Sequence, residues 1–430
     1  MVSANALLLL LLIRRKRRRA ERLALLDEEE ARLEEEEARQ EEEARREHER
    51  RAREGEEARL AEEEARQAEA IRRERERIRL HRRDNRIPRY ALDLPSQSCF
   101  QRIYESGDDD ALITLTGFNH SSFRYMLDKF EALYQRYTPY SKEGTLKELR
   151  TRQRASGRPR EINATQCLAL VLAWYRSDCL QQLLAVIFGA TQSVVSLFLR
   201  FGRRLLLMLL SSDDLAEMRV PTQRQVEAYK STIQAEYPDF HDVYAVLHGL
   251  KLDIQKCGDR TKDKIFFNQS THGHYINNVF VFTPDGLIIS AGLDAPGSME
   301  DSWVAERDGV NNDLEDVYDA TGGRAVVDYT FGAKDYPFLI KCQEFTDDAE
   351  DPAVTICQSS EWGMRALRRS FPRLSSTMAY EERGEREVIL RSIVLLFNLR
   401  TRLVGYDQVR SSFWEPLQRN IDTLLPTNER

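Results

Sequence analysis

The sequence has few cysteines and no long apolar run. Its six cysteines are widely spaced and form no Cys-x-x-Cys pair, so neither a disulfide scaffold nor a ribbon-type zinc site is expected. The apolar stretch Ala6–Ile13 is far shorter than the about 20 residues that cross a membrane. Its basic cluster Arg14–Arg19 follows the stretch, whereas a secretory signal places the charge first. We therefore expect no membrane association, and the cluster is typical of nuclear import, although it also fits the start of a charged helix.

An excess of positive charge is also lacking. The chain has 64 Lys and Arg against 71 Asp and Glu, a formal net charge of −7. Acidic and basic residues balance over residues 1–87, so the remainder carries the whole negative charge. This argues against a broadly basic nucleic-acid binder, but a locally basic groove can coexist with a negative total.

Residues 1–87 form a charged arm that differs from the rest of the chain. Leu33–Ile78 is almost wholly Glu, Arg, Ala and Gln, with acidic and basic residues at i,i+4 spacing, which predicts a long solvent-exposed helix. Few apolar residues recur at heptad positions, so a single helix is favoured over a coiled coil.

Residues 240–405 carry strand and helix patterns that predict a mixed α/β domain. Tyr244–Asp253 is apolar and β-branched, and a hairpin with a Pro-Asp-Gly turn follows it. Gly323–Gly332 contains a short buried strand that ends in Asp328. Downstream, an amphipathic helix begins near Glu361. The order of elements favours a mixed sheet flanked by helices.

Several motifs of this region resemble the Harbinger-type DDE transposases and the nuclease-like proteins derived from them. They are His248–Leu252, Phe280–Gly286, Ala295–Ser298 with Asp301 and Ser302, Val326–Asp328, Glu361–Leu367 and Ser370–Leu374. The similarity runs from about Leu115 to Arg402. It implies an RNase H-like fold in which three acids hold two divalent cations, Mg²⁺ or Mn²⁺, with Asp328 as the second acid and Glu361 as the third. Carboxylate oxygens are the hard ligands that such cations prefer.

The first acid of that pattern is missing. The family places an Asp before the Gly-Leu-Lys-Leu segment, where this chain has His248, and imidazole brings no negative charge. Asp253 is five residues further along the strand, which sends its side chain to the opposite face of the sheet. We expect His248 to mark the position of the lost acid and Asp301 to be a secondary ligand, although an Asp-Ser pair is more typical of a turn or a helix cap.

A zinc site is a weaker alternative. It would use Cys257, His272 and His274 with His248, which are suitable residue types at irregular spacing.

Residues 88–215 predict a helical region that contains a helix-turn-helix. A Gly-containing turn at 188–190 separates two apolar helices, the second of which begins near Thr191. The residues proposed to contact DNA are Arg158, Arg160, Thr191, Gln192, Ser193, Ser196 and Arg200. An ordinary helical bundle with Gly189 as a helix C-cap is the alternative.

The resemblance implies a metal-dependent endonuclease that cleaves and transfers transposon ends in DNA, with a separately encoded Myb-like DNA-binding protein as partner. The loss of the acid at position 248 favours a second hypothesis, a catalytically dead protein that binds DNA or another protein. In a third, the charged arm makes the chain chiefly a spacer. The oligomeric state stays open, and residues 406–430 are expected to be a tail.

Overall fold

The computed structural model divides the chain into two units, residues 1–86 and 87–430. In the first unit it describes residues 45–63 and scattered positions between 22 and 77. In the second it describes residues 87–140, 146–149, 159–256, 260–269, 271–328, 331–332, 335–341, 363–380 and 383–405. The predictions for Ala6–Ile13, Arg14–Arg19, Arg158, Cys257, Glu361 and residues 406–430 lie outside the described residues.

Residues 45–63 of the first unit form a continuous helix whose side chains are all exposed. Its charged residues pair along the helix at i,i+4 spacing, as between Arg46 Nη2 and Glu42 Oε1 at 2.6 Å and between Arg51 Nη2 and Glu47 Oε1 at 2.6 Å. Such exposed pairs each contribute about 0.3–0.5 kcal/mol, so the helix depends on many of them together.

The N-terminal part of the second unit is helical. Its elements are η1 (Arg89–Ala91), η2 (Pro95–Gln97), α2 (Cys99–Ser106), α3 (Asp109–Thr116), α4 (His120–Arg136), α5 (Ala164–Arg176), α6 (Gln181–Phe188) and α7 (Gln192–Leu210), with a small antiparallel pair, β1 (Tyr137–Thr138) and β2 (Lys147–Glu148). Helix α5 begins with a capping box between Asn163 and Gln166. Eleven of its 13 residues are buried, which makes it the central helix of this part.

A six-stranded mixed sheet follows α8 (Gln223–Glu236). Its strands are β3 (Val243–Asp253), β4 (Phe267–Asn268), β5 (Gly273–Phe282), β6 (Ile288–Pro296), β7 (Arg324–Val327) and β8 (Leu339–Lys341). Strand β5 pairs antiparallel with β3, β4 and β6, whereas β7 lies parallel to β3 and β8 lies parallel to β7. The predicted hairpin and the strand before Asp328 are therefore present.

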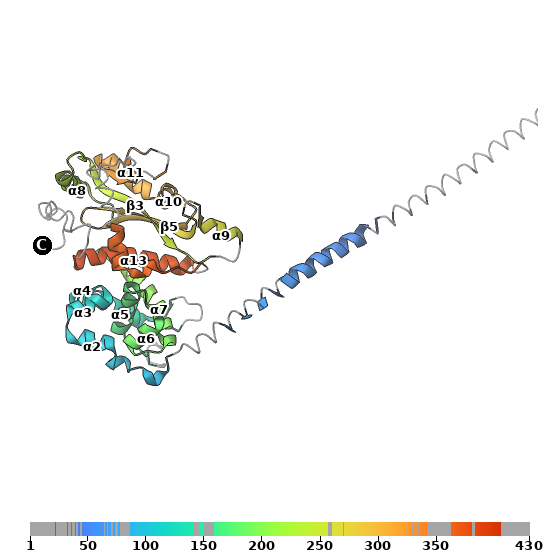
Figure 1. Ribbon diagram of the computed structural model, residues 1–430, viewed down its shortest axis with the longest axis horizontal. Coiled ribbons are helices and arrows are strands. Elements are labelled where there is room, and N and C mark those ends of the chain that lie inside the picture. Colours follow the sequence, from blue (N-terminus) through green and yellow to red (C-terminus); the bar gives the residue numbers. More distant parts are fainter. Residues whose placement is uncertain are drawn as a thin grey trace, which may run out of the picture. The chain divides into compact units, whose positions relative to one another are not determined.

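Helices cover both faces of this sheet (Figure 1). Helices α8, α10 (Asp301–Arg307) and α11 (Val310–Thr321) lie on one face, and α13 (Arg383–Leu403) lies on the other, between the sheet and the N-terminal helices. Helix α9 (Arg260–Phe266) precedes β4, and η4 (Pro372–Ser375) follows a helical segment at residues 363–370. This mixed α/β architecture is consistent with the RNase H-like fold that the resemblance implies.

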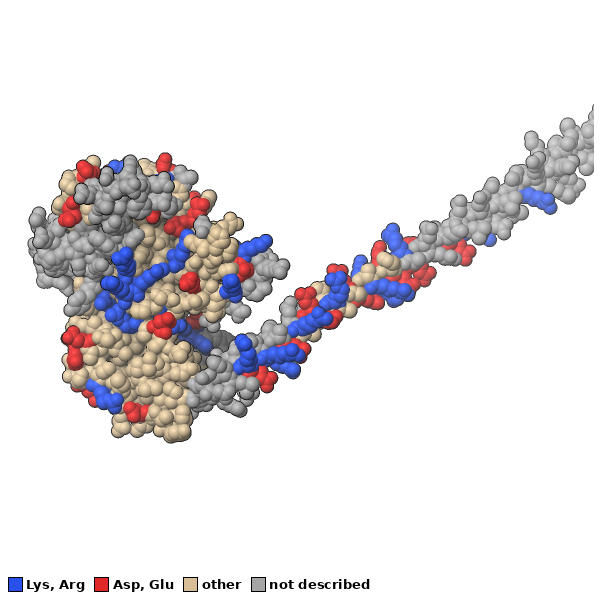
Figure 2. Space-filling model, viewed as in Figure 1, with Lys and Arg blue, Asp and Glu red and all other residues tan. Residues whose placement is uncertain are grey.

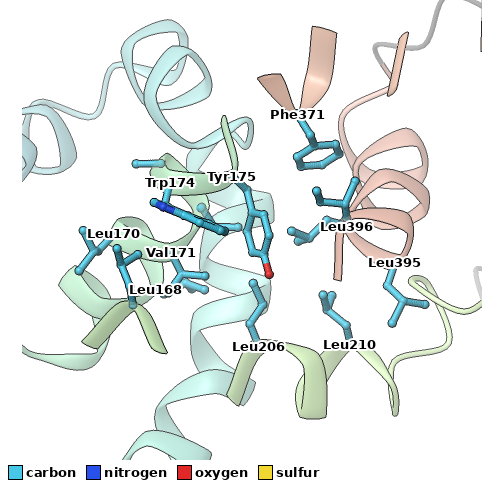
Figure 3. Packing of buried hydrophobic residues seen from close by; sticks show 14 of the residues in the cluster. Leu168, Leu170, Val171, Trp174, Tyr175, Leu206, Leu210, Phe371, Leu395 and Leu396 are labelled. Atoms are coloured by element: carbon cyan, nitrogen blue, oxygen red, sulfur yellow. The ribbon is translucent and has the colours of Figure 1, made fainter. Parts of the chain in front are cut away.

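One hydrophobic cluster joins the N-terminal helices to the sheet. It includes residues of α5, α7, α13 and segment 363–374 together with Leu250 and Phe280 of the sheet. Figure 3 shows part of this cluster, where Tyr175 of α5 points toward Leu206, Leu210, Phe371 and Leu396, and Trp174 lies on its other side near Val171. The predicted parts 88–215 and 240–405 therefore share a single core.

Within the described residues, no single helix has the length and apolar character to cross a membrane. Helices α6 and α7 together would meet that test by length and composition, but the chain bends by 96° between them.

Candidate functional site

The structure places His248 and Asp328 on neighbouring parallel strands. Val246 of β3 pairs with Val326 of β7, and Leu247 pairs with Val327. Continuing this register by one residue sets Asp328 opposite His248, with parallel strands about 4.8 Å apart. The side chains of the paired residues Leu247 and Val327 point to one face of the sheet. Successive side chains of a strand alternate between the faces, so those of His248 and Asp328 both point to the other face. The register of the two strands therefore brings His248 and Asp328 together, and their role in a common site stays a prediction.

The face that carries His248 is the one covered by segment 363–374 and α13. His248 pairs with Phe280 on β5, and Phe280 and Phe282 belong to the cluster that contains α13. Gly363 lies against the Phe282 ring, and a Cβ at this glycine would be 3.1 Å from three ring atoms. The helical segment 363–370 therefore begins on the face of His248. Glu361 precedes Gly363 by two residues and lies outside the described residues, so its predicted role stays a prediction.

Asp301 lies on the other face of the sheet. A Cβ at Gly249 would fall 1.9 Å from Asp301 Oδ2, so this carboxylate fills the place where the side chain of residue 249 would stand. Asn277 Nδ2 also donates to Asp301 Oδ1 at 2.6 Å. Because residues 248 and 249 point to opposite faces, Asp301 is separated from His248 by the sheet. The structure therefore does not bring Asp301 to the site as a metal ligand: its carboxylate anchors the start of α10 to the sheet.

The alternative zinc set is also separated. His274 pairs with Phe267 at the start of β5, whereas His248 pairs with Phe280 six residues further along the same strand. At about 3.4 Å per residue this spacing is roughly 20 Å. Nε2 of His274 instead lies 2.9 Å from Asp263 Oδ2, and Cys257 is outside the described residues. Among the described residues, no group of three or more His, Cys, Asp and Glu side chains could hold a metal ion.

The donor set therefore does not fit a pair of magnesium ions. The position that the resemblance assigns to a bridging carboxylate holds an imidazole, which suits Zn²⁺ or Ni²⁺ better than Mg²⁺. Asp253 cannot replace it, because this residue is exposed at the far end of β3 and an odd number of residues away. Asp328 is the one acid of the predicted set that the described residues place beside position 248.

Helices α6 and α7 meet at a bend of 96°, and Gly189 between them is in the left-handed conformation at φ 62°. The helix-turn-helix stays a prediction, because an ordinary helical bundle with Gly189 as a C-cap has the same turn. Val194, Val195, Phe198 and Leu199 are buried, as their spacing predicts. Of the residues proposed to contact DNA, Ser193 and Arg200 are exposed, and Thr191, Gln192 and Ser196 are half-buried. Thr191 occupies the N-cap position of α7 but its side chain accepts no capping hydrogen bond.

The surroundings of this turn are not those of a phosphate-binding surface. Arg89 Nη1 donates to the carbonyl of Gly189 at 3.1 Å, and the backbone of Asp93 and Leu94 packs against the same glycine. The side chains that α6 exposes, Leu183 and Val186, are apolar, as is Leu180 just before it. A duplex held there would meet few cations.

Arg160 is directed into the protein. Its guanidinium donates to the carbonyl of Tyr137 at 2.6 Å and to that of Tyr134, and its Cζ lies 4.2 Å from the centre of the Tyr134 ring. These contacts fix the chain before α5 and occupy the donors that a phosphate would need. The structure thus gives Arg160 a structural role in place of the predicted DNA contact.

Several arginines gather where α5, α7 and segment 363–373 meet. The sequence showed them only as the polar side of a helix. Arg203 and Arg373 flank the Trp174 ring, with their Cζ atoms 4.6 and 4.3 Å from it. Arg176 Nη1 donates to the carbonyls of Arg369 and Ser370 at 2.7 and 2.9 Å. Burial lowers the pKa of Arg373, with the neighbouring Asp178 opposing this effect. These contacts join residues that are far apart in the sequence.

Comparison with protein families matches residues 247–398 to the family described as DDE superfamily endonuclease. The matched segment contains His248, Asp301, Asp328 and Glu361, and it leaves α2 to α8 outside, although the motifs led us to expect similarity from Leu115 onward. Comparisons with curated proteins and with solved structures gave no match.

Proposed function

We propose that this chain, whose residues 247–398 are a domain of the DDE superfamily endonuclease type, is a transposase-derived DNA-binding protein with a nuclease centre disabled at its first acidic position. The observation that carries this proposal is the register of β3 and β7, which sets His248 beside Asp328 where the family has a pair of carboxylates. A neutral imidazole at this position removes one of the negative charges that hard divalent cations require.

A DDE endonuclease domain implies an interaction with DNA. DNA is therefore the substrate class, and we propose that the protein has kept DNA binding although it has lost DNA cleavage. We also propose a nuclear location, supported by the cluster Arg14–Arg19, and a Myb-like partner protein that supplies base recognition. The charged arm would then act as a spacer, which its exposed ion pairs support.

The test is nicking of supercoiled plasmid by the full chain in Mg²⁺ or Mn²⁺. We expect the unaltered protein to be inactive, His248→Asp to nick, and the double variants His248→Asp with Asp328→Asn or with Glu361→Ala to be inactive again. His272→Asp is the matched control, because it makes the same substitution in the turn before β5 and should not create activity.

Binding of Mn²⁺ provides a second measurement that does not depend on cleavage. His248→Asp should bind the ion more tightly than the unaltered chain, because it adds an anionic oxygen ligand. Equal binding by both proteins would show that position 248 is not part of a metal site.

The competing function is an active metal-dependent endonuclease in which His248 is itself a ligand. The proximity of an imidazole to Asp328 favours it, since imidazole binds several transition metals. Metal-dependent nicking by the unaltered chain that is lost in His248→Ala would establish this function and refute inactivation.

A further inference from the structure

We propose that a groove between α2, α3, α5 and α6 binds an amphipathic helix of a partner protein. Leucine or isoleucine side chains of that helix would enter the groove, and a lysine or arginine beside them would lie against Asp110. We call this cavity the α6 groove; its lining includes Ile103, Asp110, Leu115, Cys179, Leu183 and Ile187. No step of the argument uses DNA, so the inference goes beyond the proposed function and does not depend on it.

The first argument is that the groove is a hollow with apolar walls. Its volume is about 510 Å³, within the range of about 300–1,000 Å³ that is typical of binding pockets. Ile103, Leu115 and Ile187 line it and are half-buried, whereas Leu183 in the same lining is 52% exposed. Apolar walls that stay open to water favour a ligand that removes them from water.

The second argument is that the apolar surface continues beyond the groove. Leu180 lies just before α6, and Leu183 and Val186 follow it at three-residue spacing. Leu180 is 73% exposed and Val186 is 46% exposed, and both are outside the lining of the groove. Figure 2 shows that the visible surface of helices α2 to α6 is mostly free of charged side chains. Neighbouring exposed apolar side chains of this kind mark interaction sites on soluble proteins.

This extended surface fits a helix better than a small molecule. A small molecule inside the cavity would leave Leu180 and Val186 in water. The side chains of a helix at positions i, i+3, i+4 and i+7 form one apolar stripe. One or two of them can fill the cavity while their neighbours cover the exposed side chains of α6, as in other complexes of a helix with an apolar groove.

The third argument is the charge around the groove, which favours a basic partner. Residues 99–116, which include α2 and α3, have four acids and one base, and residues 177–188 have one acid and no base. Asp110 lies in the first turn of α3, is exposed and lines the groove. Arg176 also lines it, but its Nη1 donates to two backbone carbonyls of segment 363–373. A cation beside the apolar stripe of the partner would therefore meet the carboxylate of Asp110.

The same charge disfavours a second copy of this chain as the occupant. Two copies joined through the α6 groove would be related by a two-fold axis, which sets each surface against itself. The acids of α3 would then lie near one another, and like charges across an interface oppose association.

The groove is also held in place by the core beneath it. Phe100 of α2 stacks on Phe188 of α6 with ring centroids 5.1 Å apart, and both rings are fully buried. Leu184 is part of the lining and is 1% exposed. Because its walls are fixed in the free protein, the groove loses little conformational entropy when a helix binds.

The test is fluorescence anisotropy of a labelled synthetic peptide with the full chain. The peptide has about 18 residues, with leucines along one face of its helix and lysines on both flanks of that face. A matched peptide has glutamates in place of the lysines. We expect the unaltered chain to bind the lysine peptide about tenfold more tightly than the glutamate peptide at low salt.

Variants of the chain locate the contact. Leu183→Gln should weaken binding of the lysine peptide by about tenfold or more, because burial of a leucine side chain is worth at least that factor. Asp110→Lys should reverse the preference between the two peptides. Val220→Gln is the matched control, because Val220 is 43% exposed and lies before α8, and it should leave both affinities unchanged. Circular dichroism and thermal unfolding confirm that each variant is folded.

Cys179 provides a local readout of binding. Its thiol is half-buried and lines the groove, whereas Cys99 of α2 is also half-buried but is outside the lining. With the lysine peptide at ten times its Kd, alkylation of Cys179 by iodoacetamide should slow by about tenfold, and that of Cys99 should not change. Mass spectrometry of the digested protein measures both rates.

Several results would overturn the proposal. If the unaltered chain does not bind the lysine peptide, or if Leu183→Gln keeps its affinity, the groove does not bind a helix of this kind. An unchanged preference in Asp110→Lys would refute the basic character of the partner. If sedimentation shows a dimer that Leu183→Gln dissociates and the peptide does not, the occupant is a second copy. If a small apolar dye protects Cys179 and the peptide does not, the groove is a small-molecule site.

Discussion

Gly249→Ala tests whether Asp301 is a structural anchor. A methyl group at this position would stand 1.9 Å from Oδ2 and 2.5 Å from Cγ of Asp301, well inside van der Waals contact. Asp301 cannot withdraw freely, because its Oδ1 accepts from the fully buried Asn277 and its backbone begins α10. The substitution must therefore displace either the carboxylate or the helix.

The expected magnitude follows from these contacts. Overpacking of a well-packed site costs about 1–3 kcal/mol, and we expect the upper half of that range because the clash is with a fixed group. Asp301→Ala alone removes a charge-assisted hydrogen bond and costs about 1.5–3 kcal/mol. In the double variant the methyl group occupies the space that the carboxylate leaves. Its cost should be close to that of Asp301→Ala alone, which gives a coupling energy of about 2 kcal/mol.

The assay is urea unfolding of the full chain followed by tryptophan fluorescence. All four tryptophans, Trp174, Trp303, Trp362 and Trp414, lie after Arg86, so the signal reports the second unit. Gly384→Ala, at a helical position with open space around the glycine, is the matched control and should be neutral or slightly stabilising. Strictly additive effects of Gly249→Ala and Asp301→Ala would refute the packing described above and would reopen a ligand role for Asp301.

Two further predictions concern the N-terminal helices. Burial raises the pKa of the Tyr175 hydroxyl to about 12, because the folded chain favours its neutral form. The resulting stability should be present below pH about 10, the ordinary pKa of tyrosine, and should be lost as the pH rises toward 12. Tyr175→Phe should remove about 1.3 kcal/mol of alkaline loss in urea titrations between pH 9 and 11, because about one unit of the two-unit shift is expressed by pH 11, and an unchanged pH profile would contradict it. Gly189→Ala should destabilise the second unit by about 2 kcal/mol or more, because φ is 62° and the new Cβ would stand 2.8 Å from the carbonyl of Asp93. If the midpoint of urea unfolding of Gly189→Ala equals that of the unaltered chain, segment 89–94 does not pack against the turn at Gly189.

The strands could be predicted because their signals are local. The apolar run from Tyr244 to Leu252 and the strand before Asp328 are short and sharply bounded, and a parallel arrangement brings their ends to one edge. The family motifs then supplied the pairing of position 248 with Asp328. The register of β3 and β7 agrees with that expectation.

Side-chain direction was harder to predict. Asp301 begins a helix, and nothing in its local sequence states which face of the sheet that helix covers. The glycine at position 249 was the available signal, because a strand residue without a side chain often marks close approach by another group. Arg160 was misjudged for a similar reason: its partners are the carbonyls of Tyr134 and Tyr137, and only the folded chain brings them close.

The group of arginines around Trp174 was missed because the segments that carry it are distant in the sequence. Helix α7 and segment 363–373 each look like an amphipathic helix with a solvated basic side. Their lack of acidic residues in an acidic chain was the signal that could have marked them. Only the contacts of both segments with Trp174 bring these arginines together.

The shared core of the second unit has a consequence for synthesis on the ribosome. Tyr175 and Leu206 pack against Leu395 and Leu396 of α13, the last helix of the described chain. Roughly 170 residues separate the end of α7 from the start of α13, so at about 5–20 residues per second the early helices wait roughly 10–35 s for their final partner. During that interval their apolar faces are open to solvent and to chaperones. The nascent chain cannot finish its first helical layer until its last helix has emerged.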